Sequence, residues 1–337
     1  MSVKISFILP CYNVAPYIGR CLSSIEHQDM PQSDYEVICV DDCSKDNTVD
    51  VIRGFQKQYD NIRLICHKEN KTAGGARNTG LEEAQGEYVW FVDPDDRIVE
   101  DVLVRLYGLA KDKNADVLVF NYTIIDSNGN ARNTRMISNH EEMLTGQQFF
   151  IKHCPKKRMA EVTSVWRCLF KLTFCSTNSL RFPEIKSSQD VVFLWNSFLK
   201  AQRLGSVEDI GYVCYKRDDS TTGKKGKYRA INAFSASILY PYSLLKLTEA
   251  DPIDGQYVLD LQFEASDSIN NDSRKVLKMS LFEQRRFYFE MQQYLRMIVS
   301  LRPYMNKRTS NIFNFKLPFF MWIMMIYGYK LYDLIRL

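Results

Sequence analysis

The most constraining feature of this chain is an apolar run that ends abruptly in carboxylates. Residues 88–92 predict a buried strand, and Asp93, Asp95 and Asp96 follow it directly. Because proline cannot continue a ladder of backbone hydrogen bonds, the strand should stop at Pro94. The carboxylates then lie at the carboxyl end of a strand, where open α/β sheets bind ligands. A pair of carboxylates one residue apart suits a hard divalent cation, although an acidic turn that caps the next helix is the simpler alternative.

The amino terminus also predicts a strand that ends in a polar loop. Residues 3–9 predict a strand, and a polar-aromatic loop over 10–13 separates it from an amphipathic helix. Tyr12 in this loop is a candidate for stacking on a nucleobase. Packing against the protein is the alternative, and it is the commoner role of a single tyrosine.

Two further predicted strands end in polar loops. The strand over 35–40 runs into Asp41 and Asp42, whose adjacent like charges cost energy unless a hydrogen-bond donor or a cation compensates them. A nucleobase N–H is a candidate donor. The strand over 62–66 precedes a glycine-rich loop that contains Arg77. Glycines let backbone approach a ligand closely, and a guanidinium suits phosphate or a carboxylate.

Strands alternate with helical patterns through about residue 120, which predicts a mostly parallel, doubly wound α/β sheet. Residues 121–137 predict a hairpin that turns at Asn128-Gly129. Farther along the chain the pattern becomes helical. We therefore expect a sheet domain over 1–225 and a helical carboxyl-terminal region over 226–337.

The composition excludes several classes. The 337 residues carry a formal net charge of only +4, which gives no whole-protein argument for nucleic acid as a partner. The nine cysteines form no Cys-x-x-Cys pair and the four histidines are dispersed, so neither predicts a metal centre. Pro10 interrupts the short apolar run at the amino terminus, which is unlike a signal peptide. Together these features favour the reducing cytosol.

Short segments of the first hundred residues, taken in order, resemble inverting family 2 glycosyltransferases of the GT-A (Rossmann-like) fold. They are Pro10-Cys-Tyr-Asn13, Val40-Asp-Asp-Cys-Ser44, Ala76-Arg-Asn-Thr-Gly80, Gly86-Glu-Tyr88 and Asp93-Pro-Asp-Asp96. The Gln-x-x-Arg-Trp signature of processive synthases is absent. The chain is therefore most similar to the non-processive members that build bacterial surface polysaccharides.

The resemblance implies a nucleotide-diphosphate sugar donor, expected to be a UDP-sugar, and a divalent cation, Mn²⁺ or Mg²⁺. The residues it assigns to the donor are Pro10, Tyr12, Asp41, Asp42, Asn70, Arg77, Asp93, Asp95, Arg217 and Ser220. For the last two an ordinary polar loop is the alternative. Asp93 and Asp95 would also hold the metal–diphosphate group, since a cation neutralises the negative charge that grows on a departing diphosphate.

Inversion needs one base to take a proton from the acceptor hydroxyl. The family uses the Asp of a Glu-Asp pair at the start of a helix, and the matching residue is Asp190. Its alternative role is a first-turn Asp that complements the helix dipole. Gln189 replaces the usual Glu and is a candidate on the acceptor side. Trp166 is either a second acceptor-side residue that stacks on a sugar or part of the core.

The carboxyl end has a different composition. Residues 291–332 contain no acidic residue, and residues 317–329 are uncharged and rich in Phe, Trp, Met and Ile. This uncharged segment is shorter than the roughly 20 residues of a spanning helix. With its flanking cations it predicts a basic, aromatic membrane-surface segment near 302–337 that lies on anionic lipid. A helix buried against the sheet domain or a partner chain is the alternative.

The sequence thus predicts a glycosyltransferase that is peripheral on the cytoplasmic face of the cell membrane. It would move one sugar to a hydroxyl of a saccharide acceptor, expected to be lipid-linked. A sugar nucleotidyltransferase is a weaker alternative, because that class has a glycine-rich basic loop after its first strand. A degenerate nucleotide-sugar-binding scaffold at the membrane is the other alternative, and Gln189 is its only support.

Overall fold

The computed structural model describes residues 3–134, 142–146, 148–149, 164–183 and 189–216, with a few positions between 280 and 289. By internal contacts the chain divides into two units, Met1–Lys225 and Gly226–Leu337. The predictions for the 302–337 segment, and for Arg217 and Ser220, lie outside the described residues. Within the described part of the chain, no helix has the length and apolarity needed to cross a membrane.

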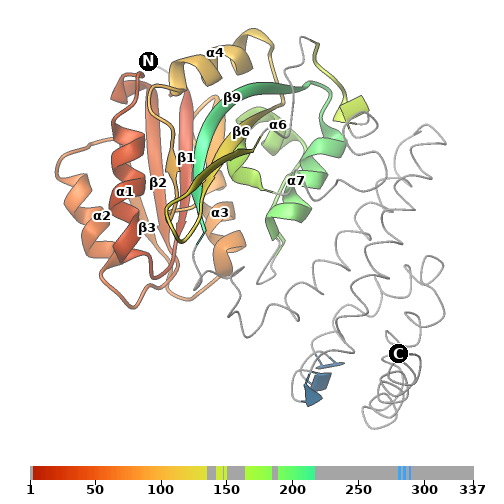
Figure 1. Ribbon diagram of the computed structural model, residues 1–337. Helices are drawn as coiled ribbons and strands as arrows, with labels where there is room; N and C mark the ends of the chain where they lie inside the picture. Colours follow the sequence, from red (N-terminus) through yellow and green to blue (C-terminus); the bar gives the residue numbers. More distant parts are fainter. Residues whose placement is uncertain are drawn as a thin grey trace. The chain divides into compact units, whose positions relative to one another are not determined.

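Strands and helices alternate in the first unit (Figure 1). The strands are β1 (Ile5–Cys11), β2 (Tyr35–Asp41), β3 (Ile62–Cys66), β4 (Tyr88–Phe91), β5 (Arg97–Ile98), β6 (Val117–Ile125), β7 (Ala131–Thr134), β8 (Cys168–Lys171) and β9 (Leu204–Tyr215). The helices are α1 (Ala15–Glu26), η1 (Gln32–Asp34), α2 (Thr48–Gln56), α3 (Thr72–Glu83), α4 (Leu103–Asp112), η3 (Val165–Arg167), α6 (Leu172–Thr177) and α7 (Gln189–Lys200).

The sheet has the strand order β3-β2-β1-β4-β8-β6-β9-β5, with β7 paired to β6. Strands β3, β2, β1 and β4 are parallel, as predicted. Beyond β4 the sheet departs from the predicted mostly parallel order, because β8 pairs antiparallel with both β4 and β6, while β6 and β9 are again parallel. The sheet is therefore mixed, and the parallel half carries the predicted motifs.

The predicted hairpin is present between β6 and β7. Its turn is built by Asp126, whose Oδ1 accepts hydrogen bonds from the backbone N–H of Asn128 (2.9 Å) and Asn130 (3.0 Å). Gly129 has φ +82°, a conformation that glycine adopts without steric cost. The first strand of this hairpin is the outer part of β6, which is continuous from Val117 to Ile125.

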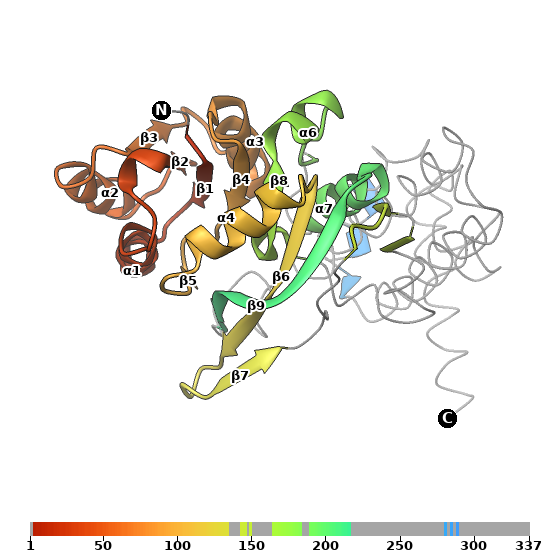
Figure 2. The same ribbon diagram turned by 90° about the horizontal axis from the view of Figure 1, so that it is seen from above.

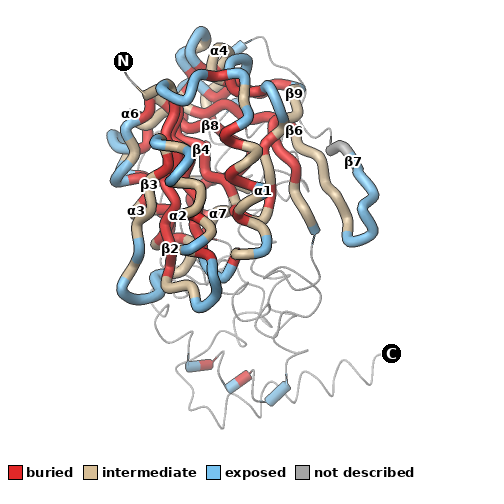
Figure 3. The backbone as a smooth tube through the Cα atoms, turned by 90° about the vertical axis from the view of Figure 1, so that its left-hand side faces the viewer, coloured by how far each residue is buried: buried red, intermediate tan, exposed pale blue. Residues whose placement is uncertain are grey.

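Helices cover both faces of the sheet (Figure 2). Helices α1, α2 and α4 pack on one face, where Ile18, Leu22 and Leu106 join the main core. Helices α3 and α7 lie on the other face. There the Phe91 ring meets Phe182 and Phe193 edge-on, at centroid distances of 5.0 and 5.4 Å. The central strands are accordingly buried on both sides, while the β7 hairpin is exposed (Figure 3).

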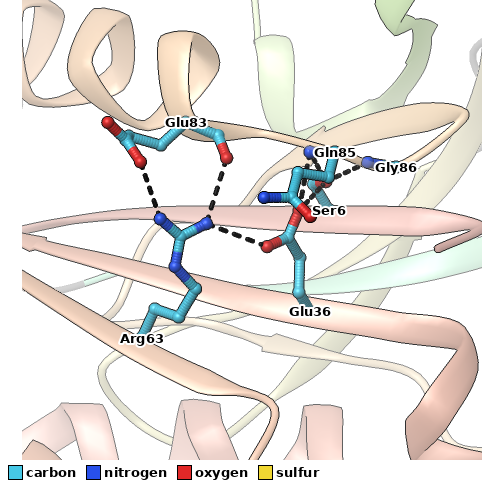
Figure 4. A network of polar contacts seen from close by, with 6 residues as sticks. All are labelled: Ser6, Glu36, Arg63, Glu83, Gln85 and Gly86. Carbon is cyan, nitrogen blue, oxygen red and sulfur yellow. Dashed lines mark hydrogen bonds and ion pairs between the residues drawn. The ribbon is translucent and has the colours of Figure 1, made fainter.

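A buried polar network fixes the strands near their amino ends (Figure 4). The Glu36 carboxylate accepts hydrogen bonds from Ser6 Oγ (2.7 Å), the Gln85 N–H (2.7 Å) and Arg63 (3.2 Å). These partners come from β1, β3 and the turn before β4. A Cβ at Gly86 would lie 2.6 Å from the Ser6 nitrogen, so only glycine fits there. Because a buried carboxylate is costly unless its oxygens are bonded, the network holds these strands in register.

Candidate active site

Those predicted donor residues that the structure describes lie toward the opposite, carboxyl edge of the parallel strands. In the sheet register Cys11 pairs with Asp41, and Asp41 pairs with Cys66, so three strands end level with one another. The structure differs from the prediction at Pro10, which lies inside β1 rather than in a loop, because pairing with β2 continues through Cys11. Tyr12 follows directly and is 49% exposed, so its ring is available to a ligand.

In the acidic turn after β4, two of the three carboxylates are partly exposed and the third is buried. Ligand atoms of Asp93, Asp95 and Asp96 lie within 4.8 Å of one another, and Asp93 and Asp95 are half-exposed. Asp96 is buried, and its oxygens accept hydrogen bonds from Tyr212 Oη (2.9 Å) and the Tyr215 N–H (2.7 Å). Burial, and then the charges of Asp95 and Asp93, raise the pKa of Asp96 well above its usual value.

The three carboxylates of the turn therefore differ in their roles. Asp96 is committed to the protein, whereas Asp93 and Asp95 offer hard carboxylate oxygens of the kind that Mg²⁺ or Mn²⁺ prefers. The residues present thus fit the predicted cation. Two carboxylates leave most of the coordination sphere to phosphate and water.

Neighbouring elements hold the turn in place, and the sequence alone did not reveal them. Tyr212 Oη accepts a hydrogen bond from the Asp93 N–H at 3.1 Å. Arg20 on α1 donates to the Asp95 carbonyl at 2.6 Å and stacks over the Tyr215 ring, 3.6 Å from its centroid. The backbone of the acidic turn is therefore tied to β9 and α1. No local pattern marks these residues, because their partners are distant in sequence.

Arg77 lies on α3 beside the same turn. Its guanidinium donates to Asp93 Oδ1 at 2.6 Å and faces the Phe182 ring at 5.4 Å. The side chain is buried, and its Nε has no hydrogen-bond partner. A buried guanidinium N–H without a partner is costly, which favours an anionic ligand at this position. The predicted role of Arg77 toward a diphosphate is compatible with this geometry.

Asp41 and Asp42 are both buried at the end of β2. Asp41 Oδ2 accepts from the Ser44 N–H at 3.2 Å, while its Oδ1 is buried without a partner. Asp42 Oδ1 accepts from His67 Nδ1 and from the Lys71 N–H, both at 2.8 Å. The two like charges are therefore only partly compensated, and one buried acceptor remains for a ligand donor.

Asn70 lies in the loop between β3 and α3, where its side chain contacts Asp42 and Thr72. Its side-chain amide donates to the Asp42 carbonyl at 2.9 Å, and its Oδ1 accepts from the Thr72 N–H at 3.2 Å. Both contacts are within the protein. Asn70 thus shapes the loop between β3 and α3, next to the carboxylates that the sequence assigns to the donor.

Asp190 and Gln189 open α7 on the α3 side of the sheet. Desolvation raises the pKa of Asp190 to about 6, an effect that nearby Arg77 opposes and Asp93 strengthens. Gln189 is buried and its Oε1 has no partner. A Cβ at Gly74 would lie 3.2 Å from the Gln189 Cγ, so a glycine in α3 lets the start of α7 approach closely.

Of the two alternatives for Trp166, the structure favours the one in which the ring is part of the core. Its ring stacks on Tyr212, with centroids 4.5 Å apart and planes 12° apart, and Tyr122 packs edge-on against it. The Trp166 carbonyl also accepts from Trp90 Nε1 at 2.7 Å. With 8% of the residue exposed, the ring has no face for a sugar. The acceptor-side prediction for Trp166 is wrong for this reason.

Comparisons with known proteins agree on one family. The model of Glycosyl transferase family 2 matches residues 6–169. Glycosyltransferase GlyG of Streptococcus pneumoniae is 39% identical over 234 residues, which cover 65% of this chain and 73% of that protein. The poly(ribitol-phosphate) beta-glucosyltransferase of Bacillus spizizenii is 34% identical over 219 residues, which cover 64% of this chain. This chain spans only about a third of the length of that relative (33%).

A solved structure shows the fold. The crystal structure of Staphylococcus aureus TarS 1-349 in complex with UDP-GlcNAc superposes with a TM-score of 0.70 at 23% identity. The match covers 93% of this chain and 87% of that chain. The predicted GT-A fold is thereby confirmed.

Proposed function

This chain belongs to glycosyltransferase family 2, and we propose that it transfers one sugar, with inversion, from a UDP-sugar to a hydroxyl of a saccharide acceptor. The observation that carries the proposal is the position of Arg77. Its guanidinium binds Asp93 at 2.6 Å, and its charge acts on the Asp190 carboxyl. A candidate diphosphate site and a candidate base are therefore neighbours at one edge of the sheet.

The chemistry follows from these neighbours. Asp190, once ionised, would take the proton of the acceptor hydroxyl as that oxygen attacks the anomeric carbon. The bond from this carbon to the diphosphate breaks on the opposite face, which inverts the configuration. Arg77 would stabilise the departing diphosphate. A divalent cation bound at Asp93 and Asp95 would add positive charge next to the same phosphates.

The residues assigned to the nucleotide favour a base that carries an N–H donor. Asp41 Oδ1 is a buried acceptor without a partner, and it would be satisfied by the imino N–H of uracil. The exposed ring of Tyr12 offers a surface on which a base can stack. TarS, whose fold this chain shares, binds UDP-GlcNAc, which supports a UDP-sugar as the donor.

The acceptor and the cellular location are proposed from a relative and from the composition of the chain, rather than from the geometry of the site. One relative is named for transfer to poly(ribitol-phosphate), which supports a cell-surface polymer or its precursor as the acceptor. A lipid-linked acceptor and a position on the inner face of the cell membrane rest on the composition of residues 302–337 alone. Gln189 offers an unpartnered amide oxygen beside Asp190 that an acceptor hydroxyl could donate to.

A panel of nucleotide sugars tests the proposal. UDP-sugars should raise the melting temperature of the protein and should be turned over in Mn²⁺ or Mg²⁺, since a ligand that binds only the folded state stabilises it. Asp190→Asn should keep the stabilisation and lose turnover, while Asp112→Asn, an exposed Asp on α4, should behave as wild type. Stabilisation without turnover in wild type would favour the scaffold. No response to any nucleotide sugar would contradict the proposal.

A further inference from the structure

We propose that His67 is a positioning residue of the nucleotide site, which fixes the Asp42 carboxylate beside the buried acceptor that Asp41 Oδ1 offers to the base. The inference rests on the proposed function and adds a residue that no sequence pattern singled out. His67 directly follows β3, at the edge where the other strands carry their polar residues. Its side chain is only 5% exposed.

Both ring nitrogens of His67 are engaged. Nδ1 lies 2.8 Å from Asp42 Oδ1, and Nε2 lies 2.9 Å from Thr79 Oγ1 on α3. A carboxylate only accepts hydrogen bonds, so Nδ1 carries the proton toward Asp42. In the neutral ring Nε2 accepts from the Thr79 hydroxyl; in the charged ring it donates. In either form the imidazole is held at both ends and has no nitrogen left for a ligand.

The backbone of His67 reinforces this arrangement. Its N–H donates to the Asp41 carbonyl at 2.9 Å, and its carbonyl accepts from Cys43 Sγ at 3.1 Å. Cys43 has φ +65°, a conformation that is uncommon for residues other than glycine. His67 therefore supports the unusual turn that follows Asp42 as well as the carboxylate itself.

The consequence is a division between the two oxygens of Asp42. Oδ1 accepts from His67 and from the Lys71 N–H, while Oδ2 takes part in neither bond. The backbone N–H of Asp42 donates to the Cys11 carbonyl, and its carbonyl accepts from Asn70. Each backbone group and one carboxylate oxygen are thus committed to the protein. Without His67, the carboxylate could rotate, and a ligand would have to restrict it on binding.

Two amide substitutions of His67 test the contacts of its two ring nitrogens separately. In His67→Asn the amide nitrogen takes the place of Nδ1, which keeps the bond to Asp42. In His67→Gln it reaches the place of Nε2, which keeps only the contact to Thr79. His67→Leu removes both. His27→Gln, at the end of α1 and away from this edge, is the matched control.

The measurement is the dissociation constant of UDP by calorimetry, with melting temperature and donor KM and kcat alongside. UDP binding should be close to wild type in His67→Asn and His27→Gln. It should weaken by about 10-fold to 100-fold in His67→Gln and His67→Leu, the scale of a lost hydrogen bond to a charged group. Donor KM should rise by a similar factor while kcat at saturating donor changes less, since His67 acts through Asp42, which is assigned to the donor.

The outcomes separate the inference from the proposed function. If wild type binds UDP and folded His67→Gln binds it equally well, His67 has no positioning role and the proposed function stands. If His67→Asn weakens binding as much as His67→Gln does, the bond to Asp42 is not what matters and the inference is wrong. Wild type that binds no nucleotide overturns the proposed function, and the inference with it. Should His67→Leu fail to fold, the Asn and Gln pair decides.

Discussion

The Tyr212 hydroxyl donates to the buried Asp96 carboxylate at 2.9 Å, across 116 positions of sequence. The same oxygen accepts from the Asp93 N–H. One phenol at the end of the mixed sheet therefore holds both ends of the acidic turn that follows β4. The half-exposed carboxylates of Asp93 and Asp95 owe their placement to this contact as much as to their own strand.

Tyr212→Phe should loosen the acidic turn. The substitution keeps the ring that stacks on Trp166 but removes one of the two donors to the buried Asp96 carboxylate, which should lower the free energy of unfolding by about 1–3 kcal/mol. The Mn²⁺ concentration for half-maximal activity should rise. Urea denaturation and metal titration measure the two effects. Tyr59→Phe, whose ring also stacks on an aromatic neighbour, is the control. An unchanged metal titration would contradict the positioning of Asp93 by Tyr212.

Asp95→Asn should abolish metal-dependent turnover with little change in melting temperature. The carboxylate is half-exposed, so its loss costs little packing, but it removes one of two charged cation ligands. Turnover by wild type should also stop in excess chelator and return with Mn²⁺ or Mg²⁺. Full activity of the variant, or of wild type in chelator, would contradict a metal role.

Asp190→Asn should lower kcat by about 10² to 10⁴, the usual contribution of a general base. The pKa of Asp190 is raised to about 6, and the carboxyl is a base only when ionised. Wild-type turnover at saturating donor should therefore fall as the pH drops through about 6. The residual activity of the variant should lack this decline. High residual turnover with collapsed donor affinity would instead make Asp190 a structural residue of α7.

Glu36→Gln should destabilise the protein without altering donor affinity. An amide cannot accept from Ser6, the Gln85 N–H and Arg63 together, because its nitrogen is itself a donor. The expected loss in free energy of unfolding is about 1–3 kcal/mol, measured by urea denaturation. Exposed Glu82→Gln should cost less than half as much. A change in the UDP dissociation constant would show that the two edges of the sheet are coupled.

Truncation before Arg302 should release the protein from liposomes that contain anionic lipid, because the segment carries the clustered cations and aromatics. Each cation contributes roughly 1 kcal/mol near such a surface. Sedimentation with liposomes at low and high salt measures this, and neutral liposomes are the control. Donor hydrolysis should survive. If the truncated protein misfolds while the intact chain ignores the liposomes, the segment is core.

The sequence predicts those parts of the site that depend on one strand and its own loop. Strands β1, β2 and β4 are predictable because their apolar runs end near Pro10, Asp41 and Pro94, and these ends place the carboxylates at one edge. The antiparallel pairings of β8 were not predicted, since the pairing of β8 with β4 leaves no local pattern. Tyr212 and His67 were missed for a related reason. Each is one polar residue whose partners become neighbours only when distant strands and helices assemble.

The network around Glu36 and the candidate active site lie at opposite ends of the same strands. Strand register is thus set at an edge that no substrate is proposed to touch. The loops at the other edge can differ in length and chemistry between related proteins without unsettling the sheet. For engineering, this separates two tasks: donor or acceptor preference can be varied in libraries confined to the loops after β1, β2, β3 and β4. Substitutions that compensate for lost stability can be sought around Glu36.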